Sequence, residues 1–134
     1  MPHLVALYTR ELDALTDMDG LCRRLADAML AVRDEAGAQV FPTGGTRVLA
    51  YPAAHNAVAD GTRDYLFIYL NLRMGRGRSA AVHQAVGAAV TEAAKAHLQP
   101  LFETRHIGLT VQVDEGQELY DSKTSTIHPL FARA

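Results

Sequence analysis

Residues 65–79 read YLFIYLNLRMGRGRS and contain the strongest strand pattern of the chain. Residues 65–72 are aromatic, β-branched or otherwise apolar almost throughout, which predicts a strand covered on both faces. A glycine-rich turn follows, and it ends at Ser79, a good N-cap for a helix. Beyond the turn, a stripe of mainly apolar residues recurs at helical spacing, at Val82, Val86, Ala89, Val90, Ala93 and either His97 or Leu98. The pattern predicts a strand, a turn and a helix in direct succession.

The second half of the chain closes with another strand. Pro100 is expected to kink or end the preceding helix. Residues 106–113 then alternate, with Ile107, Leu109, Val111 and Val113 on one face of the predicted strand. From Asp114 the chain is polar, and it ends in an apolar patch at residues 127–131, of a kind that often packs onto a neighbouring surface. The second half is therefore predicted to be a β-α-β unit.

The first half shows the same order of elements. Leu4–Tyr8 is an apolar run that predicts a buried strand. A helix is expected to begin at an N-cap at Thr16 or Asp17 and to end at Gly37. A second strand over residues 46–51 is expected to stop at Pro52. The apolar positions of the predicted helix are Leu21, Leu25, Met29, Val32 and Ala36. Since the halves are similar in length, we expect one domain, residues 1–134, with pseudo-repeats at about 1–60 and 61–134.

The order of elements indicates an α/β (α+β) fold. Two right-handed β-α-β crossovers would place both helices on one face of a four-stranded sheet. The other face would remain bare although its strands are apolar. Such faces are usually buried by other subunits. The sequence therefore predicts an oligomer.

Composition excludes several classes of partner. The chain has 134 residues, 13 basic and 15 acidic side chains and a net charge of -2, so its charge does not favour nucleic acid or an anionic membrane. No apolar run is long enough to cross a bilayer, and the first residues lack the pattern of a signal peptide. Cys22 is the only cysteine, which favours a reducing compartment. We expect a soluble, cytoplasmic protein.

Three arginines are candidates for binding an anion. Arg76 and Arg78 lie in the turn before a predicted helix N-terminus, where N–H groups and guanidinium groups could hold a carboxylate or phosphate. A basic turn in solvent is the alternative. Arg47 follows Gly44 and Gly45, which would allow close approach of a ligand, although a surface ion pair explains it equally well. The six histidines show no metal-ligand spacing, and no Gly-x-Ser-x-Gly motif occurs, so neither a metal nor a serine hydrolase is expected.

The start of the chain has two interpretations. Pro2 directly follows Met1 and leads into the first predicted strand. Proline is tolerated as the first residue of a strand, and this structural role alone would explain its position. If Met1 is removed, however, Pro2 presents a secondary amine that the strand would hold in a fixed place.

The whole set of motifs resembles the 5-carboxymethyl-2-hydroxymuconate isomerase family of the tautomerase superfamily. The residues that carry the resemblance are MPHL at 1–4, FPxxGxR at 41–47, DG through DY at 60–65, GxGRS at 75–79 and IHxLF at 127–131. It implies a homotrimer with active sites at subunit boundaries, no cofactor, and a role in bacterial homoprotocatechuate breakdown. It also implies an enzyme, an intramolecular isomerase of the keto–enol tautomerase type.

The resemblance further implies roles for individual residues. Pro2 would be the general base, and Arg47 and Arg78 would bind or polarise carboxylate and keto groups of the substrate. Arg76 is a departure from the family, an extra cation in the turn, and is a candidate for substrate binding. An α-amine has a pKa of about 8, and desolvation with nearby cations would lower that pKa toward neutrality.

Some features differ from the family and leave alternatives open. Many relatives carry an acid and a Tyr-Ser pair in the first strand, where this chain has Ala6-Leu7 and then Tyr8-Thr9. One alternative is a keto–enol tautomerase of a phenylpyruvate-like acid. Another is a non-catalytic trimeric anion-binding or scaffold protein that retains Met1. The roles of Arg73 and His3 are open.

Overall fold

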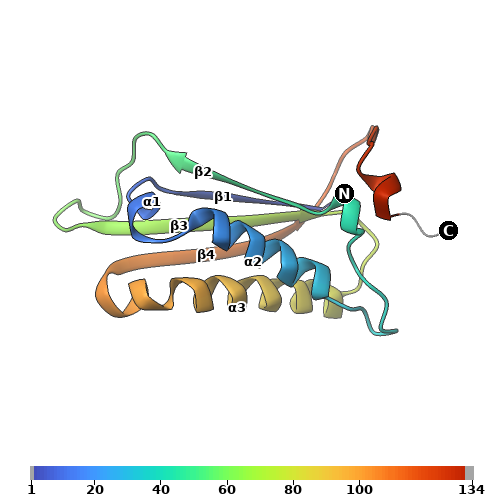
Figure 1. Ribbon diagram of the computed structural model, residues 1–134, viewed down its shortest axis with the longest axis horizontal. Helices are drawn as coiled ribbons and strands as arrows, with labels where there is room; N and C mark the ends of the chain where they lie inside the picture. Colours follow the sequence, from blue (N-terminus) through green and yellow to red (C-terminus); the bar gives the residue numbers. More distant parts are fainter. Residues whose placement is uncertain (1, 132–134) are drawn as a thin grey trace.

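A four-stranded sheet forms one layer of the protein, and helices form the other (Figure 1). The computed structural model describes residues 2–131. Its strands are β1 (His3–Thr9), β2 (Arg47–Ala53), β3 (Tyr65–Met74) and β4 (His106–Glu115). Its helices are α1 (Leu12–Leu15), α2 (Met18–Ala31) and α3 (Ala80–Thr104), with 3-10 turns η1 (Thr43–Gly45) and η2 (His128–Phe131). Among the described residues, no helix is both long and apolar enough to cross a membrane.

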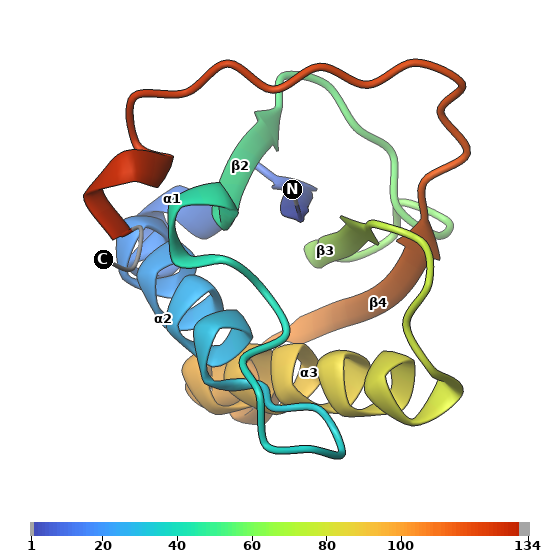
Figure 2. The same ribbon diagram turned by 90° about the vertical axis from the view of Figure 1, so that its right-hand side faces the viewer.

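The sheet consists of two parallel pairs joined in antiparallel. The strand order is β2-β1-β3-β4, with β1 parallel to β2, β3 parallel to β4, and β1 antiparallel to β3. Both long helices, α2 and α3, cover the same face of the sheet (Figure 2). The predicted fold of two β-α-β units with both helices on one side is confirmed.

The core lies between the sheet and the two long helices. Alternate residues of the central strands point into it, because side chains alternate between the faces of a strand. Its fully buried members on the long elements are Leu4 of β1, Ile68, Leu70 and Leu72 of β3, Leu21, Leu25 and Met29 of α2, and Val86, Val90, Ala94 and Leu98 of α3, and Leu12 and Phe41 are fully buried beside them. The helical periodicity of the sequence thus indicated the correct inner faces.

A short helix that the sequence did not indicate follows β1 directly. Leu12 of α1 is fully buried, and the Asp13 carboxylate accepts a hydrogen bond of 2.6 Å from the Tyr8 hydroxyl. Burial and this hydrogen bond raise the pKa of Tyr8 to about 12. Four residues are too few to show a periodic pattern, so α1 depends on this tertiary contact.

The predicted end of α2 at Gly37 is wrong. The helix ends at Ala31, and Val32 turns to an extended conformation so that its side chain enters the core. Residues 32–40 then form a hairpin-like loop, with Arg33 and Gln39 bridged in antiparallel fashion. Gly37 adopts a φ of 82° within that loop, where its N–H donates to the Asp34 carbonyl at 2.9 Å. The glycine serves a tight turn and not a helix cap.

Two prolines do not end the elements that contain them. Pro52 lies within β2, which is an edge strand and therefore tolerates a residue without an N–H group. Pro100 lies within α3, which continues to Thr104. Both Pro100 and Ala96, whose carbonyl loses its helical partner, are exposed, so water can bind that carbonyl. The predicted stop at Pro52 is wrong, and so is an end of the helix at Pro100.

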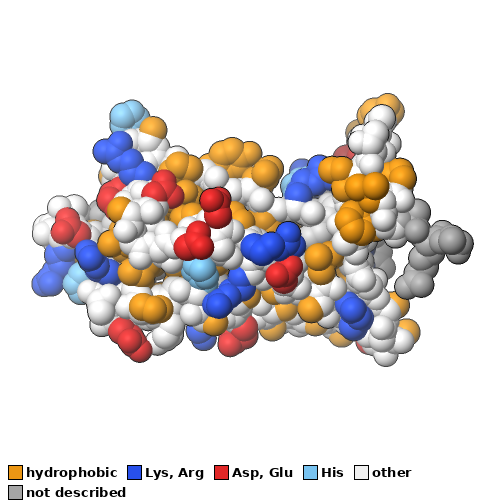
Figure 3. All heavy atoms as spheres, in the orientation of Figure 1, with side chains coloured by type: hydrophobic (Ala, Val, Ile, Leu, Met, Phe, Trp, Pro, Cys, Tyr) orange, Lys and Arg blue, Asp and Glu red, His pale blue; other side chains and the backbone are white. Residues whose placement is uncertain are grey.

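The second face of the sheet is apolar and uncovered in the single chain. Leu7 is 48% exposed, Leu49 46% and Tyr51 50%, and they lie on adjacent strands β1 and β2. Hydrophobic side chains gather along the upper edge of the molecule over these strands (Figure 3). This is the bare apolar face expected from the sequence.

Candidate active site

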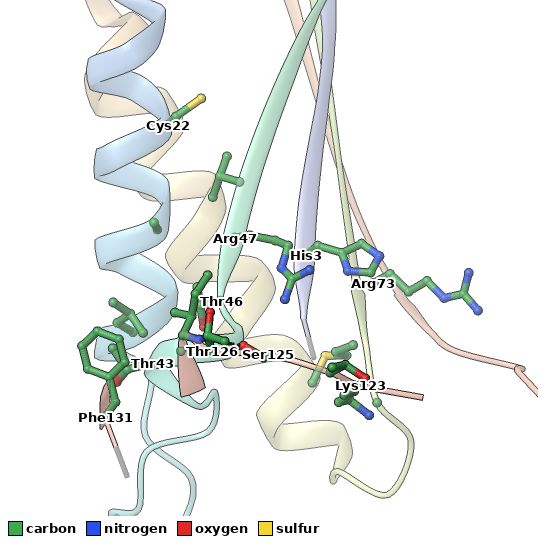
Figure 4. A pocket seen from close by; sticks show the side chains of 18 of the residues that line it. His3, Cys22, Thr43, Thr46, Arg47, Arg73, Lys123, Ser125, Thr126 and Phe131 are labelled. Atoms are coloured by element: carbon green, nitrogen blue, oxygen red, sulfur yellow. Dashed lines mark hydrogen bonds between the residues drawn. The ribbon is translucent and has the colours of Figure 1, made fainter. Parts of the chain in front are cut away.

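Three strand ends meet next to Pro2 and bring charged side chains together. His3, the first residue of β1, is paired in register with Arg47 of β2 on one side and with Arg73 of β3 on the other. Paired residues of adjacent strands share a face, so all three side chains lie on the face without helices. Figure 4 shows His3 between the two arginines.

An open cleft of about 1200 Å³ surrounds this end of the sheet. It extends around the edge of β2, so that α2 lines it on one side and the start of β1 on the other. Residues 116–131, here named the C-terminal arm, form its outer wall. In Figure 2 the arm leaves β4, passes over the start of β1, and ends beside η1. The cleft is therefore built from both ends of the chain.

The C-terminal arm is held against η1 by a glycine. A Cβ atom at Gly44 would lie 2.8 Å from the Cα atom of His128, which is too close for any other residue without a backbone shift. Gly44 itself is buried. From the sequence, Gly44 and Gly45 were expected to let a ligand approach the backbone closely. In the structure, the group that packs closely against Gly44 is η2 of the same chain.

Two positively charged side chains that line the cleft form ion pairs with carboxylates of the C-terminal arm. Arg73 donates from Nη2 to Oε2 of Glu118 at 3.2 Å, and Lys123 pairs with Asp121 within the arm. Burial lowers the pKa of His3, and the positive charges of Arg47 and Arg73 lower it further. The His3 imidazole is therefore neutral at neutral pH and adds no positive charge to the cleft.

Pro2 is buried at the point where β1 begins. Met1 lies outside the described residues. Removal of Met1, and with it a free amine at Pro2, stays a prediction.

The other two predicted arginines lie apart from this cleft. Arg78 donates to the carbonyl oxygens of Gly75 at 3.2 Å and Val40 at 3.0 Å, and its guanidinium lies 5.5 Å from the ring centre of Phe41. Arg76 is exposed. Within the single chain, the structure brings Arg47 to the start of β1 and places neither Arg76 nor Arg78 among the residues that line the cleft.

The predicted N-cap at Ser79 is confirmed, because its hydroxyl accepts a hydrogen bond from the Val82 N–H at 3.2 Å. The same hydroxyl donates to Glu35 Oε2 at 2.9 Å. A carboxylate of the loop after α2 therefore already lies at this helix start. Such a contact joins segments 44 residues apart and has no signature in the local sequence.

Sequence reasoning missed the contribution of the C-terminal arm to the cleft. Glu118 and Lys123 lie in a stretch without periodicity, and only the apolar residues 127–131 suggested a packing role. Among residues 2–131, no group of three histidine, cysteine or acidic side chains could hold a metal ion. Burial raises the pKa of the Cys22 thiol, and the nearby Asp19 raises it further, so this thiol stays protonated.

Comparison with known proteins gives a consistent result. The family model described as 5-carboxymethyl-2-hydroxymuconate isomerase matches residues 2–131. The 5-carboxymethyl-2-hydroxymuconate Delta-isomerase of Escherichia coli is 27% identical over 131 residues, covering 98% of this chain and 99% of that protein. A crystal structure of a 5-carboxymethyl-2-hydroxymuconate delta-isomerase superposes with a TM-score of 0.96 at 56% identity, covering 100% of this chain and 95% of the other. The isomerase structure from Deinococcus radiodurans R1 gives a TM-score of 0.86 at 29% identity, covering 98% and 95%.

Proposed function

Because the chain belongs to the 5-carboxymethyl-2-hydroxymuconate isomerase family and is therefore a tautomerase-type isomerase, we propose a specific reaction and base for it. The reaction moves a proton within an unsaturated 2-hydroxy/2-oxo di- or tricarboxylate. Pro2 is the general base. The substrate class comes from the named relatives, whose substrate is a muconate with an added carboxymethyl group.

The observation that carries the proposal is the strand register at His3, the residue that directly follows Pro2. Pro2 directly precedes His3, and His3 is in register with Arg47 and Arg73. An arginine fork binds a carboxylate through two parallel hydrogen bonds, which suits a substrate with several carboxylates. Because the lowered pKa leaves the His3 imidazole neutral, the arginines and not His3 supply the positive charge that attracts the substrate's carboxylates.

The chemistry needs one group that accepts a proton from the 2-hydroxyl group, or from carbon in the 2-oxo form, and returns it to carbon. A free Pro2 amine can do both, because it is neutral before the first transfer and protonated before the second. Between the two transfers the substrate is a dienolate, and arginine side chains stabilise its added negative charge. Arg47 and Arg78 are proposed for this role, with Arg76 as a further cation. The reaction needs no cofactor.

A panel of three substrate types tests the proposal. With N-terminally processed protein, we expect the highest kcat/KM for 5-carboxymethyl-2-hydroxymuconate, a lower value for 2-hydroxymuconate, and the lowest for phenylpyruvate, because each lost carboxylate removes an arginine contact. Ultraviolet absorbance follows each isomerisation. Preference for phenylpyruvate would favour the monocarboxylate tautomerase, and no turnover by processed protein would favour a binding or scaffold protein.

We also propose that the active enzyme is a homotrimer and acts in the cytoplasm. The uncovered face with Leu7, Leu49 and Tyr51 supports assembly, since exposed apolar patches of soluble proteins usually mark interfaces. The trimer would place a neighbouring subunit against the cleft and could bring a second subunit's Arg76 and Arg78 toward it. The single protonated cysteine, Cys22, suits a reducing compartment.

Assembly can be tested with one charge on the uncovered sheet face. We expect Leu7→Asp to convert the trimer to monomers, because the side chain is half exposed in the single chain but would place an unpaired charge inside the interface. Light scattering after size-exclusion chromatography measures the mass. Ala96→Asp, on the exposed side of α3, is the control and keeps the mass of the parent protein. A Leu7→Asp protein that remains trimeric would show that this face is not the interface.

A further inference from the structure

We propose that Arg73 selects substrates by binding one of their carboxylates, and that Glu118 holds this position in the free enzyme as an internal carboxylate. The inference rests on the proposed polycarboxylate substrate and deepens it, because it assigns one charge of that substrate to one residue. It concerns specificity, whereas Pro2 and Arg47 concern the reaction itself.

The first step of the argument is the chemistry of the Arg73–Glu118 contact. Arg73 Nη2 lies 3.2 Å from Glu118 Oε2 inside the cleft, so the guanidinium group already binds a carboxylate of the same chain. The side chains are 49% and 40% exposed. An ion pair as exposed as this contributes little to stability, so a second carboxylate can replace Glu118 at small cost. The contact shows which chemical group fits against Arg73.

The second step is the way in which Glu118 is positioned. The Gly116 N–H donates to the Met74 carbonyl at 2.9 Å, so the base of the C-terminal arm is fixed one residue beyond Arg73 on β3. Glu118 comes two residues after that anchor and thus stays within reach of Arg73. The far end of the arm is held separately, where His128 packs on Gly44. Glu118 can leave Arg73 while both ends of the arm stay bound.

The third step distinguishes Arg73 from the other cations near the cleft. Within the single chain Arg78 does not line the cleft, and Lys123 lies on the C-terminal arm and not on the sheet beside His3. Arg73 lies across His3 from Arg47. A substrate with an added carboxymethyl group can therefore contact Arg73 through its third carboxylate while Arg47 holds another, whereas a dicarboxylate without that group leaves Glu118 in place.

Equilibrium binding tests the inference without depending on turnover. The protein is the full chain with Pro2→Ala, titrated by calorimetry with 5-carboxymethyl-2-hydroxymuconate and with 2-hydroxymuconate. We expect Arg73→Met to raise the Kd of the tricarboxylate about 10- to 100-fold, the range of a lost charge-assisted contact, and to change the Kd of the dicarboxylate less than threefold. We expect Glu118→Gln to lower the Kd of the tricarboxylate severalfold, and to have no effect once Arg73→Met is present.

Two variants control for charge alone. Arg105→Met removes an exposed positive charge at the end of α3, and Glu92→Gln removes a negative charge on its outer side. Both should leave each Kd unchanged. Equal loss of affinity for both ligands in Arg73→Met, weaker binding in Glu118→Gln, or no binding of the tricarboxylate to the starting protein would overturn the inference. Failure of the proposed function is separate, since it appears as absent turnover by protein with Pro2 intact.

Discussion

Pro2→Ala is expected to lower kcat/KM for 5-carboxymethyl-2-hydroxymuconate by at least about 100-fold, within the range that a positioned general base contributes. The variant keeps an α-amine, but the amine is primary and lacks the ring that fixes its direction. Pro2 is buried at the first position before β1, so the ring holds the nitrogen where the strand begins. The residual rate reports how much of the catalysis depends on that positioning.

Pro100→Ala is the matched control for this substitution. Pro100 is exposed within α3, and alanine suits a helix better, so kcat/KM should stay the same and the melting temperature should not fall. A second variant separates the amine from the ring. Protein in which Met1 is retained has an amide at residue 2, and it should be inactive while binding the substrate panel at reduced affinity. Intact-mass analysis verifies the N-terminus in each preparation, and normal activity with Met1 attached would rule out Pro2 as the base.

The order of strands and helices could be predicted from the sequence because each element is determined mainly by the pattern of apolar residues within it. The nearly unbroken apolar run at residues 65–72 predicted the central strand β3, and the apolar spacing of α2 and α3 predicted which helix faces form the core. The predicted element boundaries were wrong where tertiary packing or solvent contact outweighed the local preference of a glycine or proline to end an element. Val32 leaves the helix to fill the core, so α2 ends before Gly37, and Pro100 is accepted because solvent can bind the freed carbonyl.

The site was less predictable than the fold, since it joins segments far apart in sequence. Arg47 stood out through the two glycines before it, and it begins β2, where it is paired with His3 at the start of β1. Glu118 could not be found in this way, because its position depends on the register that brings Arg73 beside His3 and on the anchor at Gly116. The role of Arg78 shows the same limit, since its contact with Val40 spans 38 residues.

Arg47→Ala is expected to lower kcat/KM by about 100- to 1000-fold, the effect of removing one preorganised donor from a developing oxyanion. Both kcat and KM should change, because the guanidinium would bind a carboxylate in the ground state and stabilise more charge in the dienolate. Stability should change little, since Arg47 is exposed at the start of an edge strand. Steady-state kinetics and thermal unfolding of the same preparation measure the two effects.

Arg47→Lys distinguishes the shape of the guanidinium from its charge. Lysine keeps the positive charge at the start of β2 but cannot form two parallel hydrogen bonds, so most of the loss should persist. Arg63→Ala, an exposed arginine outside the cleft, should leave kcat/KM unchanged. Full activity of Arg47→Lys would mean that charge alone matters at this position. Full activity of Arg47→Ala would remove Arg47 from the site, and the register of His3 with Arg47 would then be a feature of the sheet and not of catalysis.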